Sequence, residues 1–271
     1  MNRGMMVLPT CEVSNDPESA IELGTGWGIT NYELRVLWNN DRVPYITDAQ
    51  KEHLKKVIAE YGVRIVTISP GLFIYKPATE EIAEQELSDK LPKSLEFAAE
   101  FGCSRIIIFG FARTEGVGND FVVDKFGKAA EAARKVGCTL VVEPIGNSYC
   151  DNGADMGSII RQVGSDHLKV NLDCGNFQYT GLTAYPDEYE HVKDLVEYVH
   201  VKNWSAARQQ WALYDEGDID LKTVLRRLKQ DGYKGYLAME THVRYSQPVV
   251  AKPIDAARKS CETLARWLDE I

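Results

Sequence analysis

The chain has 271 residues, of which 44% are apolar and 26% charged, and its formal net charge is −9 at pH 7, a composition typical of globular proteins. This acidic balance argues against a nucleic-acid partner, because such binding depends largely on Lys and Arg at the phosphates. No apolar run approaches the roughly 20 residues that cross a bilayer, and the stretch before Pro9 is too short for a signal-peptide core, so we expect no membrane partner and a cytoplasmic location.

Residues 1–29 show no clear strand or helix pattern, and we predict an N-terminal extension or a leading strand and loop. From residue 30 onward, short β-rich runs alternate with amphipathic stretches. The runs predict seven strands, at 32–37, 63–68, 105–109, 139–143, 168–173, 198–202 and 236–240. The clearest helix begins at Thr47, where Thr47 and Gln50 have capping-box spacing, and ends at Gly62. Further helices are predicted at 91–101, 120–136, 154–163, 219–231 and 254–269.

Alternating strands and helices indicate βαβ units and a parallel sheet. Units of about 30 residues have the size found in a (β/α)₈ barrel. The weak stretch at 211–214 is a candidate for the eighth strand. A doubly wound open sheet is the alternative, but no predicted strand is followed by G-x-G-x-x-G. We therefore predict a single-domain (β/α)₈ TIM barrel over residues 30–271.

Four predicted strands carry, at or near their carboxyl ends, a residue of a type that commonly binds metal ions, namely Glu143, Asp173, His200 and Glu240. The carboxyl ends of barrel strands converge at one mouth, where catalytic residues lie. Because faces alternate along a strand, Val141 and Glu143 share a face, and if this face and its counterparts on the other strands point inward, the four residues meet. Three carboxylates so close would repel one another and raise some of their pKa values, and a divalent cation would remove the conflict. Oxygen ligands with one imidazole suit one Mn²⁺, Mg²⁺, Co²⁺ or Zn²⁺.

Five segments together carry a family resemblance that covers nearly the whole chain from residue 30. They are Glu143 after L-V-V, D-C-G-N at 173–176, H-V-K-N at 200–203, E-G-D-I-D at 216–220 and G-Y-K-G-Y-L-A-M-E at 232–240. In their order and spacing the chain resembles the xylose-isomerase-like TIM barrels. That superfamily includes sugar phosphate isomerases/epimerases, ketose 3-epimerases, hydroxypyruvate isomerases, inosose dehydratases and the endonuclease IV group.

The resemblance implies specific roles for these residues. Glu143, Asp173, His200 and Glu240 match the metal set of the ketose 3-epimerase branch, in which the two glutamates are also the acid/base pair. The chain departs from that branch at Asn176, where the epimerases often have a histidine. The endonuclease branch needs additional histidines for three zinc ions, so we expect one metal ion here.

Further residues near the strand ends are candidates for substrate binding. Lys202 would either hydrogen-bond a substrate oxygen or pair with a carboxylate. Arg35 would either reach the substrate or pair with Glu33 on the same strand face. Asn176, with its amide, and Trp204 and His242, on adjoining loops, complete the set.

These residues predict an isomerase or epimerase that acts on a sugar or sugar-like hydroxy-carbonyl compound through a metal-stabilised enediolate. A lyase of the inosose dehydratase type is the main alternative, because the same intermediate can eliminate water. A nuclease fits the charge and the histidine count poorly, and a metal-free binding protein stays open, as does a homo-oligomer. Six scattered cysteines without a C-x-x-C pair are typical of reduced thiols.

Overall fold

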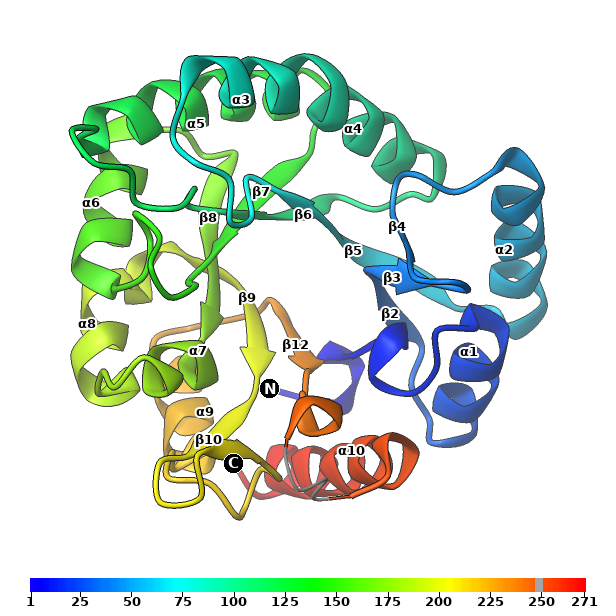
Figure 1. Cartoon of the computed structure of the whole chain (residues 1–271). Helices are drawn as coiled ribbons and strands as arrows, with labels where there is room; N and C mark the ends of the chain where they lie inside the picture. The colour runs from blue at the N-terminus through cyan, green and yellow to red at the C-terminus, as the bar shows by residue number, and fades with distance from the viewer. Residues whose placement is uncertain (247–250) are drawn as a thin grey trace.

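The apolar, β-branched runs form the strands of a closed parallel barrel in the computed structural model, which describes residues 1–246 and 251–271 (Figure 1). The barrel strands, in spatial order, are β1 (Met6–Pro9), β12 (Tyr236–Met239), β9 (Val196–Val201), β8 (Leu168–Asp173), β7 (Thr139–Glu143), β6 (Arg105–Phe109), β5 (Arg64–Leu72) and β2 (Asn31–Leu34). Two small antiparallel hairpins pair β3 (Val36–Leu37) with β4 (Asp41–Arg42), and β10 (Asn203–Ser205) with β11 (Gln210–Ala212).

Helices surround the barrel and cover its outer face (Figure 1). They are α1 (Pro17–Gly26), α2 (Asp48–Tyr61), α3 (Glu80–Gln85), α4 (Leu91–Glu100), α5 (Asn119–Lys135), α6 (Gly153–Val163), α7 (Cys174–Tyr179), α8 (Tyr189–Val192), α9 (Leu221–Gln230) and α10 (Pro253–Glu270). Short helical turns are η1 (Arg3–Met5), η2 (Thr10–Glu12), η3 (Glu86–Lys90), η4 (Ala184–Glu188), η5 (Lys193–Leu195) and η6 (Val243–Tyr245). The predicted single-domain (β/α)₈ barrel is confirmed.

The predicted signals at the ends of α2 are confirmed. Thr47 Oγ1 accepts a hydrogen bond from the Gln50 amide at 3.2 Å, and the Thr47 amide donates to Gln50 Oε1 at 2.7 Å. Gly62 ends the helix in the left-handed conformation with φ 62°. Both ends of the helix could be predicted because the capping interactions at each end involve only residues that are close in sequence.

The eighth strand is not where the sequence suggested. Residues 211–214 lie in and after β11, whose partner is β10, and they are not part of the barrel. The place is taken by β1, which pairs with β12 on one side and β2 on the other. This four-residue strand ends in proline and lacks the β-branched run that marked the other strands.

Two layers of apolar side chains flank the barrel wall. Strands alone supply the inner cluster, which consists of Val7, Val66, Ile107, Phe109, Val141, Tyr198 and Ala238. A larger cluster joins the outward-facing strand residues to the helices, with Ile106, Phe126 and Leu140 among its members. Because side chains alternate along each strand, residues two positions beyond the inner cluster also face the barrel axis. This alternation directs Glu143, His200 and Glu240 inward.

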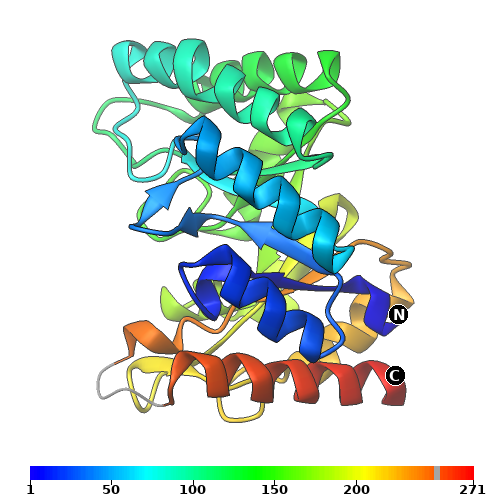
Figure 2. The same ribbon diagram turned by 90° about the vertical axis from the view of Figure 1, so that its right-hand side faces the viewer.

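The chain ends meet at the end of the barrel opposite the β3–β4 hairpin (Figure 2). An ion pair between Arg3 and Asp269 ties the N-terminal segment to α10. The strands therefore point their carboxyl ends away from both termini. Among the described residues, no helix is long and apolar enough to cross a bilayer. All six cysteines are buried and unpaired.

Two helix glycines allow a matched test of packing. A Cβ on Gly157 of α6 would lie 2.7 Å from the backbone oxygen of His191, whereas a Cβ on Gly127 of α5 would meet no atom within 4 Å. Both alanine substitutions gain helix propensity, worth about 1 kcal/mol. We expect Gly127→Ala to raise the free energy of unfolding by about that amount. Gly157→Ala should lower it by about 1–2 kcal/mol, because α6 would be forced away from α8.

Urea denaturation of the two variants measures both effects. Equal stabilisation by the two substitutions would contradict the close contact of α6 with the chain around His191.

Candidate metal centre

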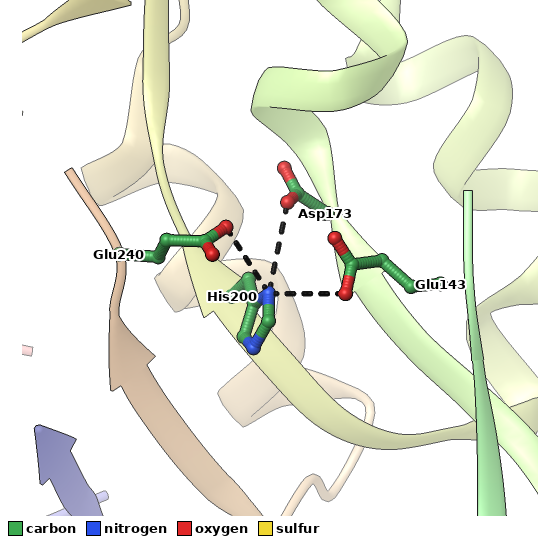
Figure 3. Close-up of side chains that lie close together, drawn as sticks. All are labelled: Glu143, Asp173, His200 and Glu240. Atoms are coloured by element: carbon green, nitrogen blue, oxygen red, sulfur yellow. Dashed lines mark ion pairs between the residues drawn. The ribbon is translucent and has the colours of Figure 1, made fainter. Parts of the chain in front are cut away.

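Four inward-facing side chains meet at the carboxyl ends of neighbouring strands (Figure 3). Glu143 ends β7, Asp173 ends β8, His200 lies in β9, and Glu240 directly follows β12. Asp173 and His200 are register partners, which places them side by side. One ligand atom from each of the four residues lies within 4.8 Å of the others, and all four side chains are buried.

His200 presents its Nδ1 atom to the three carboxylates. The atom lies 3.3 Å from Glu240 Oε2, 3.5 Å from Glu143 Oε2 and 3.8 Å from Asp173 Oδ2 (Figure 3). On the other side of the ring, Nε2 is 3.0 Å from Glu33 Oε2, which also accepts a hydrogen bond from the Tyr198 hydroxyl at 2.9 Å. With its proton on Nε2, the ring directs a lone pair from Nδ1 toward the carboxylates, as metal-binding histidines do.

The protonation of His200 depends on two opposing influences. Burial is the largest single one and lowers the pKa of His200, but Glu240, Glu33 and Glu143 together raise it well above its usual value. In the absence of a metal ion the carboxylates therefore favour the imidazolium form. A bound cation would replace that proton, as ligand deprotonation requires.

Lys202 belongs to the same cluster. Its Nζ atom lies 2.7 Å from Asp173 Oδ2 and 2.6 Å from Glu240 Oε2, and the side chain is fully buried. Burial acts to lower the pKa of Lys202, but Asp173 and Glu240 outweigh that effect and raise it. Of the two alternatives for Lys202, the structure shows the pairing with carboxylates.

Glu240 is held as an ionised carboxylate. Burial is the largest influence and would raise its pKa, but His242, Lys202, Arg35 and His200 together hold it well below the usual value. The upward pKa shift expected for some of the carboxylates does not occur at Glu240, because strand-end spacing did not reveal the cations around it. His242 Nε2 is 3.0 Å from Glu240 Oε1, and Arg35 pairs with the same oxygen.

Arg35 has partners that its position in sequence did not suggest. It pairs with Glu240 and with Glu12, and it forms no ion pair with Glu33 in the described parts of the chain. Glu12 Oε2 also accepts hydrogen bonds from the backbone amides of Thr241 and His242, each at 3.0 Å. The predicted Glu33–Arg35 pair is therefore wrong, because Glu33 binds His200 instead.

Asn176 positions two of the carboxylates. Its backbone amide donates to Asp173 Oδ1 at 2.9 Å, which makes Asp173 the N-cap of α7. Its side-chain amide donates to Glu143 Oε1 at 3.0 Å and to the Pro144 carbonyl at 2.9 Å. Asn171 donates to the other oxygen of Glu143 at 3.3 Å.

The donor set fits a single divalent cation. His200 Nδ1 is buried and has no hydrogen-bond partner in the described residues, whereas Lys202 Nζ lies 2.7 Å from Asp173 Oδ2. The region holds five carboxylates, those of Glu12, Glu33, Glu143, Asp173 and Glu240. Its permanent cations are only two, Arg35 and Lys202. A divalent ion would offset most of this excess, and carboxylates with one imidazole suit Mg²⁺, Mn²⁺, Co²⁺ or Zn²⁺.

A cavity of about 1210 Å³ opens above the cluster. Glu143, Asn176, Arg35, His242 and Trp204 line it, so most of the predicted substrate-binding residues reach one space. Lys202 does not line the cavity.

One wall of the cavity is aromatic. Trp204 and Trp211 are register partners in the β10–β11 hairpin, with ring centroids 5.0 Å apart, and Tyr179 packs against both. Lys202 Nζ lies 4.9 Å from the centroid of the Trp211 ring. This wall of the cavity is therefore apolar, whereas Glu143 supplies a carboxylate to the lining.

The remaining histidines lie elsewhere. His53 pairs with Glu18, His167 contacts the Cys138 carbonyl, and His191 is exposed. Sequence reasoning missed Glu12, because the possible leading strand in residues 1–29 was not located and its carboxyl end was therefore not searched. It also missed the contact of Glu33 with His200, which strand order alone does not predict.

Comparisons with known proteins agree with this architecture. A family model described as "Xylose isomerase-like TIM barrel" matches residues 25–270. No curated protein sequence matches the chain. Among solved structures, an L-ribulose 3-epimerase is 17% identical, with a TM-score of 0.77 over 98% of this chain and 94% of that one.

Two further solved structures resemble the chain equally well. A probable 3-DHS dehydratase, AsbF, from Bacillus anthracis is 15% identical, with a TM-score of 0.76 over 97% of this chain and 98% of that one. The IolI protein with a bound zinc atom is 16% identical, with a TM-score of 0.78 over 98% of each chain. Identities this low establish the shared fold alone.

Proposed function

Because the chain belongs to the xylose isomerase-like TIM barrel family, we propose that it is a divalent-metal-dependent isomerase or epimerase of a sugar or sugar-like hydroxy-carbonyl compound. The observation that carries the proposal is the buried set of Glu143, Asp173, His200 and Glu240, whose ligand atoms lie within 4.8 Å of one another beneath the cavity. The epimerase and the zinc-containing IolI protein among the structural neighbours support it.

The four residues of this set would hold the ion. When bound, the ion supplies Lewis-acid stabilisation of negative charge that develops on substrate oxygens. We propose that this ion is Mn²⁺, Mg²⁺, Co²⁺ or Zn²⁺.

The two glutamates would transfer the proton. Glu240 is ionised and faces the other ligands from the end of β12, so it can accept a proton from the carbon next to the carbonyl. Glu143 approaches from β7 and is held by Asn176 and Asn171. In its protonated form it would return a proton to the neighbouring carbon or to the other face, and exchange with solvent would then remove the proton from Glu240 and restore the one on Glu143. General acid–base catalysis of this kind contributes about 10²–10⁴-fold to the rate.

The aromatic wall and the amide of Asn176 favour a carbohydrate-like substrate. Trp204, Trp211 and Tyr179 offer an apolar surface to C–H groups. The floor offers ionic hydrogen-bond partners to hydroxyl and carbonyl oxygens.

Solvent exchange tests the proposal. Purified protein loaded in turn with each candidate metal ion should be incubated in D₂O with ketoses, ketose phosphates and inososes, followed by NMR. We expect deuterium to enter at the carbon next to the carbonyl of one substrate class without loss of water. Absence of exchange with every compound and metal would overturn the isomerase proposal, and absence of bound metal would favour a binding protein.

A dehydratase is the second candidate. The solved structure of the probable dehydratase supports it, as does His242, whose Nε2 lies 3.0 Å from Glu240 and could protonate a leaving hydroxyl. In the same experiment, loss of one water from an inosose would identify this reaction.

A further inference from the structure

The charges in the cavity are unevenly distributed. One carboxylate, Glu143, lines the cavity at the edge of the buried cluster, whereas three arginines, Arg35, Arg42 and Arg244, line its walls. Arg35 is neutralised by Glu12 and Glu240. Across residues 1–246 and 251–271, Arg42 and Arg244 form no ion pair with a carboxylate, although the chain carries an excess of acidic groups.

Arg42 is built into the cavity wall. It lies on β4, opposite Val36 of β3, and its guanidinium occupies the space that a side chain at Gly71 would fill. Gly71 has φ +72°, so a glycine suits both the backbone conformation and the close approach of Arg42. The side chain is half-buried and donates no side-chain hydrogen bond to any described residue.

The surroundings of Arg42 favour a bound anion. Burial is the largest influence and lowers the pKa of Arg42, and the nearby charge of Arg35 lowers it further. A guanidinium that has lost part of its hydration and lies near another cation gains strongly from an oxyanion.

Arg244 adds a second set of donors to the same space. It lies in η6, its guanidinium carbon is 5.7 Å from the ring centroid of Tyr245, and its Nε atom is buried with no hydrogen-bond partner in the described residues. Arg42, Arg244 and Tyr245 all line this one cavity. A buried donor without a partner is costly, and a ligand oxygen would satisfy it.

We infer that Arg42 and Arg244 form an oxyanion subsite, and that the substrate carries a carboxylate or phosphate group bound there while its hydroxy-carbonyl end lies over the carboxylate cluster. This inference rests on the proposed function for the reacting end of the substrate. The subsite itself depends only on the arginines. The presence of this subsite would narrow the proposed substrate class from neutral sugars to sugar phosphates or sugar-like acids.

Equilibrium binding tests the subsite. The full chain, with and without Mg²⁺, should be titrated calorimetrically with inorganic phosphate, D-gluconate and the neutral polyol D-glucitol. We expect one of the two anions to bind more tightly than D-glucitol, and the better anion identifies the oxyanion. Arg42→Gln and Arg244→Gln should each weaken binding of that anion about tenfold or more. Arg226→Gln, which makes the same charge change on the exposed face of α9, should leave it unchanged.

Circular dichroism verifies that each variant is folded, and Arg244→Gln tests the subsite independently if Arg42→Gln does not fold. Equal binding of the anion to wild type and both cavity variants, or tighter binding of D-glucitol than of either anion, overturns the inference. The two proposals fail separately: anion binding that depends on the arginines without solvent exchange removes only the isomerase proposal. Exchange on a phosphorylated or carboxylated substrate at unchanged rate in both variants removes only the subsite.

Discussion

Replacement of Glu240 by glutamine is expected to lower kcat at least about 100-fold while the fold is retained. The amide cannot accept a proton, and its neutral oxygen is a weaker cation ligand than the carboxylate. The buried cations beside it keep other partners, because Arg35 still pairs with Glu12 and Lys202 with Asp173. Solvent deuterium exchange of the substrate class found active, at saturating metal, measures the loss.

Glu197→Gln is the matched control for this substitution. Glu197 lies in β9 at the opposite end of the barrel, where it pairs with Arg105. Its loss removes the same charge without touching the cavity, and kcat should be unchanged. Turnover of Glu240→Gln equal to that of wild type would contradict the assignment of Glu240 as the base.

Replacement of Asp173 by asparagine is expected to weaken divalent-metal binding at least about 100-fold, since even partners outside the ligand set typically contribute 10–100-fold. The substitution would place an NH₂ group or a neutral oxygen where Oδ2 now faces His200 and Lys202. Helix α7 should persist, because asparagine caps helices as well as aspartate does. Calorimetric titration with Mn²⁺ and metal analysis of the purified variant measure the effect.

Asp220→Asn provides the control for this variant. Asp220 caps α9 by accepting a hydrogen bond from the Thr223 amide at 3.0 Å, and it is not a member of the candidate metal-binding cluster. Both substitutions therefore exchange one capping aspartate for asparagine. A metal affinity that falls equally in the two variants, or in neither, would show that Asp173 is not a ligand.

The prediction of the fold depended on how regular each segment was. Strands β5 to β9 and β12 were found because each is a run of apolar, often β-branched residues. Strand β1 was predicted only as one alternative for residues 1–29, a leading strand without bounds, because four residues that end in proline carry little periodic signal. The lack of bounds also hid Glu12, which lies just beyond the carboxyl end of β1 and reaches Arg35.

The sequence by itself determined the alternation of strands and helices, the (β/α)₈ class and the polar residues at the strand ends, because these depend on neighbours within a few positions of the chain. It could also indicate that Glu143, Asp173, His200 and Glu240 share an inward face, since side-chain direction alternates along every strand.

Only the tertiary structure decided how those groups pair. It placed Glu33 behind His200, Lys202 between Asp173 and Glu240, and Arg35 against Glu12 rather than Glu33. Such pairings depend on distances of a few ångströms between segments more than 200 residues apart, as between Arg35 and Glu240, whose separation is 205. Electrostatic interactions in a buried site change steeply over these distances, so protonation and charge balance follow from the packed barrel and not from residue spacing.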